Sequence, residues 1–449
     1  MDAREVGLGL DFCLRVGEVL LASGAGAADV TATMQTLARH VGLRGAEVDV
    51  TFTSLSMSYQ RTPEEVPLMS TRMVRQRAID YEHLTRVDHL VRAVLRDEVT
   101  LKEARASLAR VVSSGHDRPR WAITLGWGVM CAGVALQLGG GPVVVLIALV
   151  AAISIDRLQM WISRRRIPTF YQQVAGGGLA SLIALAASAT PLDVDVSQVV
   201  TANIVMLLAG IGFMGALQDA LSGFYITATA RGTEAILATA GIIAGVSGGL
   251  SLAYALGAGI SEIDPGRTDL QSLGMLAVGS ALCAGAFAYA SHAPRRILVP
   301  IALVAAVATV ISRSVELPGI GRTWSVALAA LFVGLVSYTV AGRMRVPPLV
   351  VVVSAVVPML PGLSIYRGLT LLAEGGTSTS AGLLAMVTAA SVAIALSSGV
   401  ILGEYVAQPL QREARRLESR LAGPRLVGPL RSPARRSRGK RRPEEVSSR

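Results

Sequence analysis

The sequence contains little charge and few aromatic residues for its length. Of its 449 residues, 16% are charged, 4% are aromatic and 52% are hydrophobic. A water-soluble domain has about 25% charged residues, and the mean hydropathy of this chain is high, at +0.52. These values exclude a chain that is water-soluble throughout, so we expect lipid to solvate part of it.

Cysteine and histidine are also scarce. The three cysteines, Cys13, Cys131 and Cys283, are far apart in the sequence, which excludes a disulfide framework or a cysteine-rich zinc site. Walker motifs are absent, which argues against an ATP-driven pump. The five histidines are scattered along the chain, and we expect them to form no ligand cluster. The sequence therefore predicts no metal site and no cofactor.

The two ends of the chain differ in charge. The first 25 residues include Asp2, Glu5 and Asp11. Because a signal peptide has a basic start and an uninterrupted apolar stretch, we expect the amino terminus to be retained in the cytoplasm. Residues 411–449 hold 13 Arg or Lys against 4 Glu, which accounts for +9 of the formal net charge of +11. Without interleaved aromatic residues, this pattern predicts a disordered basic tail near anionic lipid and no nucleic-acid partner.

Residues 1–118 are predicted to form a small soluble α+β domain in the cytoplasm. Residues 48–57 are rich in β-branched residues and alternate in polarity, as a single strand does. Pro119 ends the domain. Apolar residues recur with helical period at 5–22, 27–41, 81–95 and 100–112.

Ten apolar stretches follow, each long enough for the ~30 Å hydrocarbon core of a bilayer. They lie at 121–138, 142–162, 172–190, 197–217, 234–257, 272–290, 297–315, 324–341, 349–372 and 382–407. Nine loop arginines fall on the side of the tail and three on the other side. By the positive-inside rule, this asymmetry predicts a multi-pass protein of the inner (plasma) membrane with both termini in the cytoplasm.

The ten stretches divide into two sets of five, residues 119–260 and 261–410. A repeat with an odd number of spans inserts its second copy upside down, so the predicted fold class is an α-helical polytopic membrane protein with two inverted five-helix repeats. Such repeats are typical of transporters. Cys131-Ala132-Gly133 in the first span of one set matches Cys283-Ala284-Gly285 in the first span of the other.

The fifth span carries a small residue at every fourth position. This spacing predicts a smooth seam on which another helix packs closely. The residues are Gly241, Gly245, Gly249, Ala253 and Gly257.

The ninth span is interrupted by prolines. Pro358 and Pro361 lack the backbone N–H that a helix requires. A half-helix that restarts at Gly362 would direct the amides of Leu363 and Ser364 at an anionic group such as a substrate carboxylate. The alternative, a simple proline kink, stays open.

The fourth span has glycines at the corresponding place, including Gly212 and Gly215. Paired interruptions in the two halves of a transporter point to a substrate site at the bilayer midplane. We therefore predict that both interrupted segments shape one binding site.

Four charged residues lie in or near these two spans. Asp219, Arg231 and Glu234 occur at the predicted inner end of spans four and five, and Arg367 lies within span nine. Ionisable groups at membrane depth tend to face a cavity, pair with one another or relay protons. We predict a proton-coupling or charge network for the first three and substrate binding for Arg367. Two alternatives stay open: solvated loop charges, and an Arg367 that extends to the outer interface.

Several blocks of residues occur in an order typical of one family. They are 20–30, 48–59, 100–104, 208–216, 218–220, 223–224, 230–231, Pro358-Met359-Leu360-Pro361-Gly362 and Tyr366-Arg367-Gly368. From residue 8 to about 406 the chain thereby resembles the threonine/serine exporter family, in which a soluble domain precedes ten spans. Many members carry Pro-Gly in the fourth span, where this sequence has Gly212 and Gly215.

The resemblance implies export of threonine and serine from the cytoplasm by a proton-driven antiporter without a cofactor. It leaves open whether the chain forms a homo-oligomer. Related two-component members look suited to dicarboxylates, so a dicarboxylate exporter is an alternative. Two further alternatives are a membrane-anchored hydrolase and a sensor, each acting through residues 1–118, although that stretch has no nucleophile-base motif.

Overall fold

The computed structural model describes residues 3–75, 77–191, 194–207, 210–255, 273–316, 321–374 and 378–421. The chain divides into two compact units, Met1–Ala407 and Gln408–Arg449. The helices, strands and cavity described below belong to the first unit. Residues 422–449 of the predicted basic tail lie outside the described residues.

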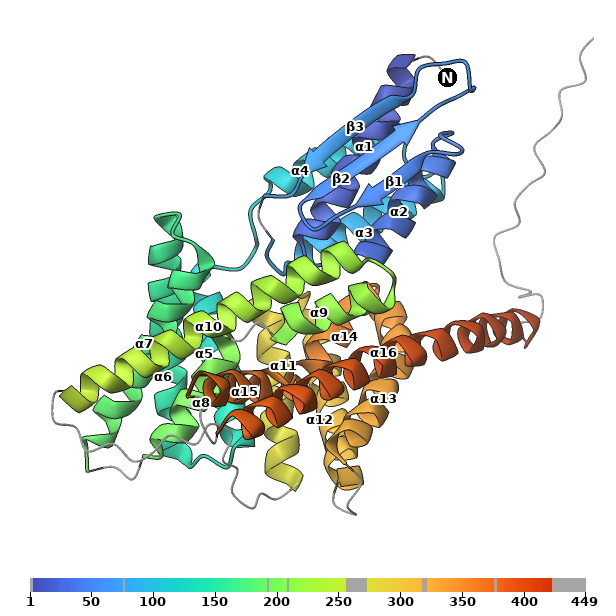
Figure 1. The fold of residues 1–449 in the computed structure, drawn as a ribbon. Helices are drawn as coiled ribbons and strands as arrows, with labels where there is room; N and C mark the ends of the chain where they lie inside the picture. The colour runs from blue at the N-terminus through green and yellow to red at the C-terminus, as the bar shows by residue number, and fades with distance from the viewer. Residues whose placement is uncertain are drawn as a thin grey trace, which may run out of the picture. The chain divides into compact units, whose positions relative to one another are not determined.

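The four helices predicted in the amino-terminal part are confirmed. They are α1 (Ala3–Ala22), α2 (Ala27–His40), α3 (Tyr81–Leu95) and α4 (Leu101–Ser113). Local side chains define two of their starts: Asp80 caps α3 by accepting from two backbone N–H groups, and Thr100 forms a capping box with Glu103 at α4. Helices α1 and α2 pack against a small sheet (Figure 1).

The strand predicted at 48–57 is wrong in extent, because it contains a turn. Strands β1 (Glu47–Val50) and β2 (Ser54–Tyr59) pair in antiparallel fashion, with Val50 opposite Leu55. The turn forms because both the N–H and the hydroxyl of Thr51 donate to the carbonyl of Ser54. A third strand, β3 (Leu68–Met73), was not predicted and pairs with the other edge of β2.

All ten predicted spans are helical over most of their described residues. The helices are α5 (Arg120–Gln137), α6 (Pro142–Arg164), α7 (Thr169–Ser188), α8 (Val196–Leu207), α9 (Gly210–Leu221), α10 (Tyr225–Ala255), α11 (Leu273–Ala290), η1 (Arg295–Ile297), α12 (Leu298–Glu316), α13 (Arg322–Met344), α14 (Pro348–Val356), η2 (Val357–Met359), α15 (Gly362–Glu374) and α16 (Thr379–Leu421). Residues 379–407 of α16 belong to the first unit.

Among the described residues, seven helices are long and apolar enough to cross a membrane, and the number of spans rises to nine if each of two bent pairs counts as one. The first predicted span, α5, is not among them. Its ends carry Arg120 and Gln137, which lower its mean hydropathy. The chain is therefore mostly helical with seven to nine candidate spans, as in a polytopic membrane protein.

The glycine seam predicted in α10 is confirmed in its described part. A Cβ added at Gly241 would lie 2.6 Å from the carbonyl oxygen of Phe170, and one at Gly249 would lie 3.0 Å from that of Gly178. Helix α7 therefore packs backbone to backbone against this face of α10. Gly257, at the end of the predicted seam, lies outside the described residues.

The same contact recurs between α16 and α13. A Cβ at Gly399 would lie 2.6 Å from the carbonyl oxygen of Ala327, and one at Gly403 would lie 2.5 Å from that of Leu331. The third and fifth helices of both predicted sets thus pack through glycines.

Two pairs of consecutive helices are bent. The angle is 45° between α8 and α9 and 48° between the α14–η2 segment and α15. Pro358 lies in η2 and Pro361 precedes α15, which begins at Gly362 as predicted. A Cβ at Gly210 would lie 3.3 Å from Cβ of Leu360, so the two bent segments lie against each other.

Candidate functional site

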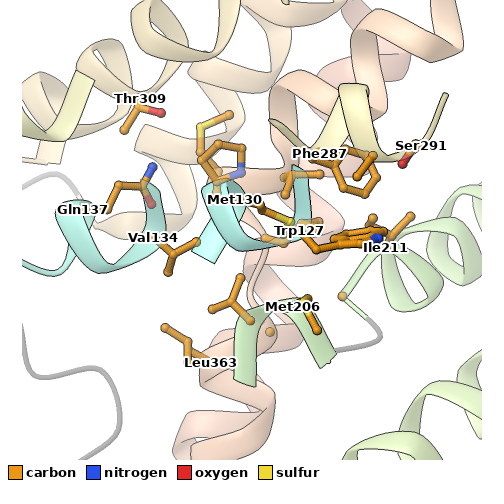
Figure 2. Close-up of a pocket in the computed structure, with 18 of the residues that line it drawn as sticks. Trp127, Met130, Val134, Gln137, Met206, Ile211, Phe287, Ser291, Thr309 and Leu363 are labelled. Carbon is orange, nitrogen blue, oxygen red and sulfur yellow. The ribbon is translucent and has the colours of Figure 1, made fainter. Parts of the chain in front are cut away.

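A cavity of about 820 Å³ lies beside the two bent segments, which is within the usual range for a small-molecule site. Much of its wall is apolar. Trp127, Met130 and Val134 line it from α5, and Phe287 lines it from α11 (Figure 2). Gln137, from the end of α5, adds a polar group. Charged residues such as Arg120, Arg313 and Glu316 line it as well, so the cavity combines an apolar part with a polar and charged part.

Four of the predicted binding residues line this cavity: Pro358, Gly362, Ser364 and Arg367. Pro361 does not line it but fixes the start of α15. The N–H of Ile365 donates to the carbonyl of Pro361 at 3.0 Å, which is the first hydrogen bond within this helix. The amides of Gly362 to Ser364 therefore have no partner within the helix, as expected at a helix start.

The two glycines predicted for the binding site in the fourth span do not line the cavity. Gly212 and Gly215 both lie inside α9 and are not among the cavity-lining residues, whereas their neighbours Gly210 and Ile211 are. A Cβ at Gly215 would lie 3.0 Å from Nη1 of Arg231. Gly215 thus leaves room for the guanidinium of Arg231.

Asp219 and Arg231 form a buried ion pair. Nη1 of Arg231 lies 2.6 Å from Oδ2 of Asp219, and the side chains are 13% and 2% exposed, respectively. Oδ1 of Asp219 also accepts the N–H of Ala27, 2.9 Å away. Ala27 begins α2, where Gly26 offers no capping side chain. Asp219 therefore caps a helix of the amino-terminal part, and the alternative of solvated loop charges does not hold for this pair.

Glu234 and Arg77 lie near this pair. Glu234 is exposed on α10. Arg77 stacks over the ring of Phe52 at 4.6 Å, and its Nη2 is buried without a hydrogen-bond partner among the described residues. Burial and the nearby Arg231 lower the pKa of Arg77 to about 10. The predicted charge network thus includes a second arginine from the amino-terminal part.

Asp156 is a charged residue that lines the cavity and was not among the predicted site residues. Asp156, in the middle of α6, is buried. Its carboxylate accepts from the hydroxyl of Thr124 at 2.6 Å and from Arg120 at 3.2 Å. A lone acidic residue within an apolar helix is the signal that identifies it.

The prediction that the histidines form no cluster is wrong. His83, His116 and His292 meet near Asp80, and Asp80, His116 and His292 line the same cavity. The rings of His83 and His116 lie 5.1 Å apart, and those of His116 and His292 lie 3.9 Å apart. The cluster lies outside the residues predicted for the site.

Seven to nine candidate spans indicate a polytopic membrane protein, and bent spans beside a cavity are typical of the transporter class. Two family models match the chain, one described as "Putative threonine/serine exporter" over residues 11–253 and one as "Threonine/Serine exporter, ThrE" over residues 276–406. The chain belongs to the threonine/serine exporter family, whose names denote transporters and not enzymes.

Two curated relatives have matching names. A protein of Mycobacterium tuberculosis named "Probable threonine/serine exporter" is 36% identical over 426 residues, which cover 92% of this chain and 80% of the relative. A protein of Corynebacterium glutamicum named "Threonine/serine exporter" is 30% identical over 420 residues, which cover 92% of this chain and 85% of the relative. No solved structure matches the chain.

Proposed function

We propose that this protein exports threonine and serine from the cytoplasm as a secondary transporter driven by the proton motive force. The observation that carries the proposal is the cavity beside the start of α15, in a chain whose relatives are named threonine/serine exporters. This transport needs no cofactor, because it requires substrate binding and a change of access to the two sides of the membrane, but no covalent bond is formed or broken.

The start of α15 is the proposed site for the substrate carboxylate. Its first-turn amides carry the positive end of the helix dipole, and backbone amides at a helix start bind anions well. Ser364 adds a hydroxyl and Arg367, one turn further on, adds a positive charge to the same cavity. Trp127 and Met130 provide an apolar surface that suits the methyl group of threonine.

We further propose ten spans in two inverted repeats, residues 119–260 and 261–410, after a soluble cytoplasmic domain of residues 1–118 and before a basic tail of residues 411–449. The glycine contacts that recur between α7 and α10 and between α13 and α16 support the repeat. Helices α5 and α11 run antiparallel, as equivalent helices of an inverted repeat do, because Gly126 meets Ala290 and Gly133 meets Cys283.

Both termini would then lie in the cytoplasm. Reporters fused after Arg166, Arg296 and Arg345 should be cytoplasmic, and one fused after Asp195 should be outside. A well-behaved fusion on the wrong side would contradict the inverted repeat.

Asp219 is the proposed coupling residue, together with Arg231 and Glu234. A buried carboxylate that is paired with an arginine and also caps α2 can change both contacts when it takes up a proton. Proton uptake at Asp219 would thus loosen the amino-terminal part from the end of α9.

Flux in vesicles tests the function. The purified full-length chain is reconstituted, and the transport of threonine, serine and succinate is measured with and without a pH gradient. We expect uphill transport of threonine and serine only with the gradient. Preferred transport of succinate would favour a dicarboxylate exporter, and absence of flux for all three would favour a sensor or hydrolase.

A further inference from the structure

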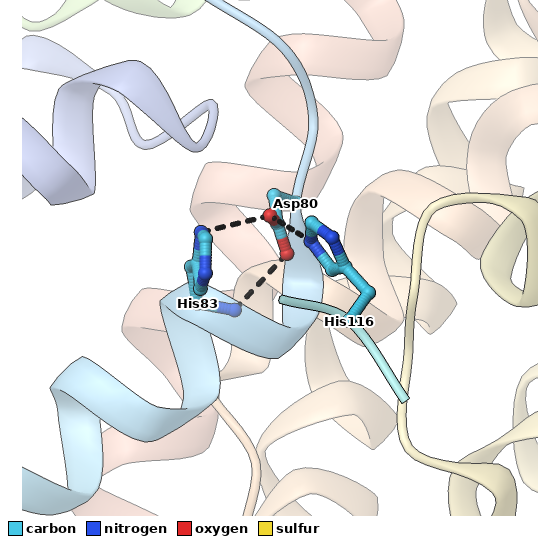
Figure 3. Close-up of side chains that lie close together, drawn as sticks. All are labelled: Asp80, His83 and His116. Carbon is cyan, nitrogen blue, oxygen red and sulfur yellow. Dashed lines mark hydrogen bonds and ion pairs between the residues drawn. The ribbon is translucent and has the colours of Figure 1, made fainter. Parts of the chain in front are cut away.

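Three side chains converge at the edge of the amino-terminal part (Figure 3). Oδ2 of Asp80 lies 2.9 Å from Nδ1 of His83 and 2.7 Å from Nε2 of His116. One ligand atom from each residue lies within 4.8 Å of the others. Two imidazole nitrogens and a carboxylate oxygen are donors that zinc commonly takes in proteins.

We propose that Asp80, His83 and His116 bind a divalent transition metal ion, for which Zn²⁺ is the best match. A tetrahedral zinc ion with bonds of about 2.0 Å holds its ligand atoms about 3.3 Å apart. The present O–N distances are 2.7 and 2.9 Å, so each of these two pairs needs to separate by about half an ångström, and the two imidazole nitrogens lie within 4.8 Å of each other.

The backbone holds Asp80 in position for this role. Its Oδ1 caps α3 by accepting the N–H groups of Glu82 and His83 at 3.1 and 3.0 Å, which leaves Oδ2 directed at the imidazoles. Such hydrogen bonds to a ligating carboxylate are usual at metal sites. Burial acts to raise the pKa of Asp80, but hydrogen bonds from His83 and His116 outweigh it and hold the pKa well below its usual range.

His292 offers a further donor. Its ring stacks on that of His116 with centroids 3.9 Å apart, and its Nδ1 is buried without a hydrogen-bond partner among the described residues. His292 and His116 form a second group of ligand atoms with Glu82. Burial and the neighbouring His116 lower the pKa of His292 to about 4.

The arginines near these ligands are occupied by other partners. Arg86 pairs with Glu82 at 2.5 Å, and Arg120 pairs with Asp156 at 3.2 Å. Arg118 donates to the carbonyl oxygens of Tyr289 and Ala293. Because the first two charges are paired, they repel a bound cation less than free guanidiniums would.

The ion would join three segments that are far apart in the sequence: the start of α3, the connection between α4 and α5, and, through His292, the turn after α11. The N–H of Tyr81 already donates to the carbonyl of Ser291 at 3.0 Å, so these segments are in contact without the ion. The site would therefore fasten the amino-terminal part to the membrane helices beside the cavity.

Zinc binding is measured without any amino acid, so its outcome is independent of the proposed function. The full-length protein, free of any histidine tag, is stripped with a chelator in detergent and titrated with Zn²⁺, and with Co²⁺ to record visible absorption. We expect one zinc per chain, the absorption bands of a tetrahedral site, and weaker binding at pH 5.5 than at pH 7.5 as the imidazoles take up protons.

Substitutions assign the ligands. His116→Ala and Asp80→Asn should weaken zinc binding by at least about tenfold. His116 lies outside the helices, and Asn retains a capping oxygen for α3, so both variants should fold. His40→Ala and His89→Ala are matched controls from the same part of the chain and should bind like the parent. No stoichiometric zinc, or full affinity in His116→Ala, would overturn the proposal.

Discussion

The two bent segments differ in what they offer to a ligand. At the start of α15, first-turn amides have no partner within the helix and the residues line a cavity with an apolar wall. At the end of α9, Asp219 is buried and satisfied by Arg231 and by the N–H of Ala27. The start of α15 thus lies beside the cavity, whereas the far end of α9, nine residues beyond the start of that helix, connects the membrane helices to the amino-terminal part.

This difference indicates separate roles for the start of α15 and the end of α9. A substrate can bind where groups lack partners, whereas a charge that already has partners changes the structure when it loses them. We therefore expect substitutions near α15 to affect substrate binding, and those at Asp219 to affect stability and coupling.

Removal of one charge of the buried pair should have the largest effect. Arg231→Ala leaves the buried Asp219 carboxylate with the Ala27 amide as its remaining hydrogen-bond partner among the described residues, at an expected cost of about 3–5 kcal/mol. Thermal unfolding in detergent and membrane abundance measure it. The double variant Asp219→Ala, Arg231→Ala should recover part of the loss, because neither charge of the pair is left without the other. A cost below about 1 kcal/mol for Arg231→Ala would place the pair in the class of surface ion pairs.

Asp219→Asn should separate coupling from binding. Asn retains an acceptor for the Ala27 N–H but cannot take up and release a proton. It also leaves the Arg231 guanidinium without its carboxylate, so flux is compared per amount of protein in the membrane, where counterflow of threonine should persist while most uphill export is lost. Asp219→Glu should retain some coupling. Equal retention of counterflow and pH-driven export in Asp219→Asn would remove Asp219 from the mechanism.

Pro361→Ala should impair the other bend. Alanine supplies the missing N–H and permits a more continuous helix, so the amides at Gly362 to Ser364 would no longer face the cavity. Loss of one hydrogen bond to a charged group costs about 1.5–3 kcal/mol, so we expect about a tenfold loss in apparent affinity or more, at normal membrane abundance. Pro348→Ala, at the first position of α14, is the control. Unchanged transport by Pro361→Ala would show that the bend is a simple proline kink without a role in substrate binding.

The smallest expected effect is a pH dependence at His83. Its hydrogen bond with Asp80 raises the pKa of His83. A raised pKa in the folded state stabilises the fold below the unfolded-state pKa of about 6.5, and this contribution is lost as pH rises through the folded-state value. In the presence of a chelator, the loss of thermal stability in His83→Gln should be larger at pH 6 than at pH 8.5. An equal loss at both pH values would show that the ion pair between His83 and Asp80 does not contribute to thermal stability.

Several features were predictable because single residues determine them. Pro358 and Pro361 withhold N–H groups in any surroundings, and the glycine spacing of α10 fixes one helix face whatever packs on it. The prediction of one strand over residues 48–57 was wrong because Thr51, Phe52 and Thr53 are residue types that favour strands but lie in a turn.

Contacts between distant segments could not be predicted from the sequence. Asp219 and Ala27 are 192 residues apart, and nothing in either neighbourhood specifies the other. The same holds for Asp80, His116 and His292. Asp156 was detectable, as a carboxylate inside an apolar helix, but the adjacent Arg157 gives the pair the appearance of loop charges.

Protection of a thiol at the start of α15 tests the central claim most directly. The native cysteines Cys13, Cys131 and Cys283 are buried and should react slowly. Ser364→Cys should be labelled by a water-soluble maleimide, and threonine should slow the labelling, because the substrate would occupy the same cavity. Thr62→Cys, on an exposed loop, should be labelled equally with and without threonine. Labelling of Ser364→Cys that threonine does not alter would contradict a binding site at α15.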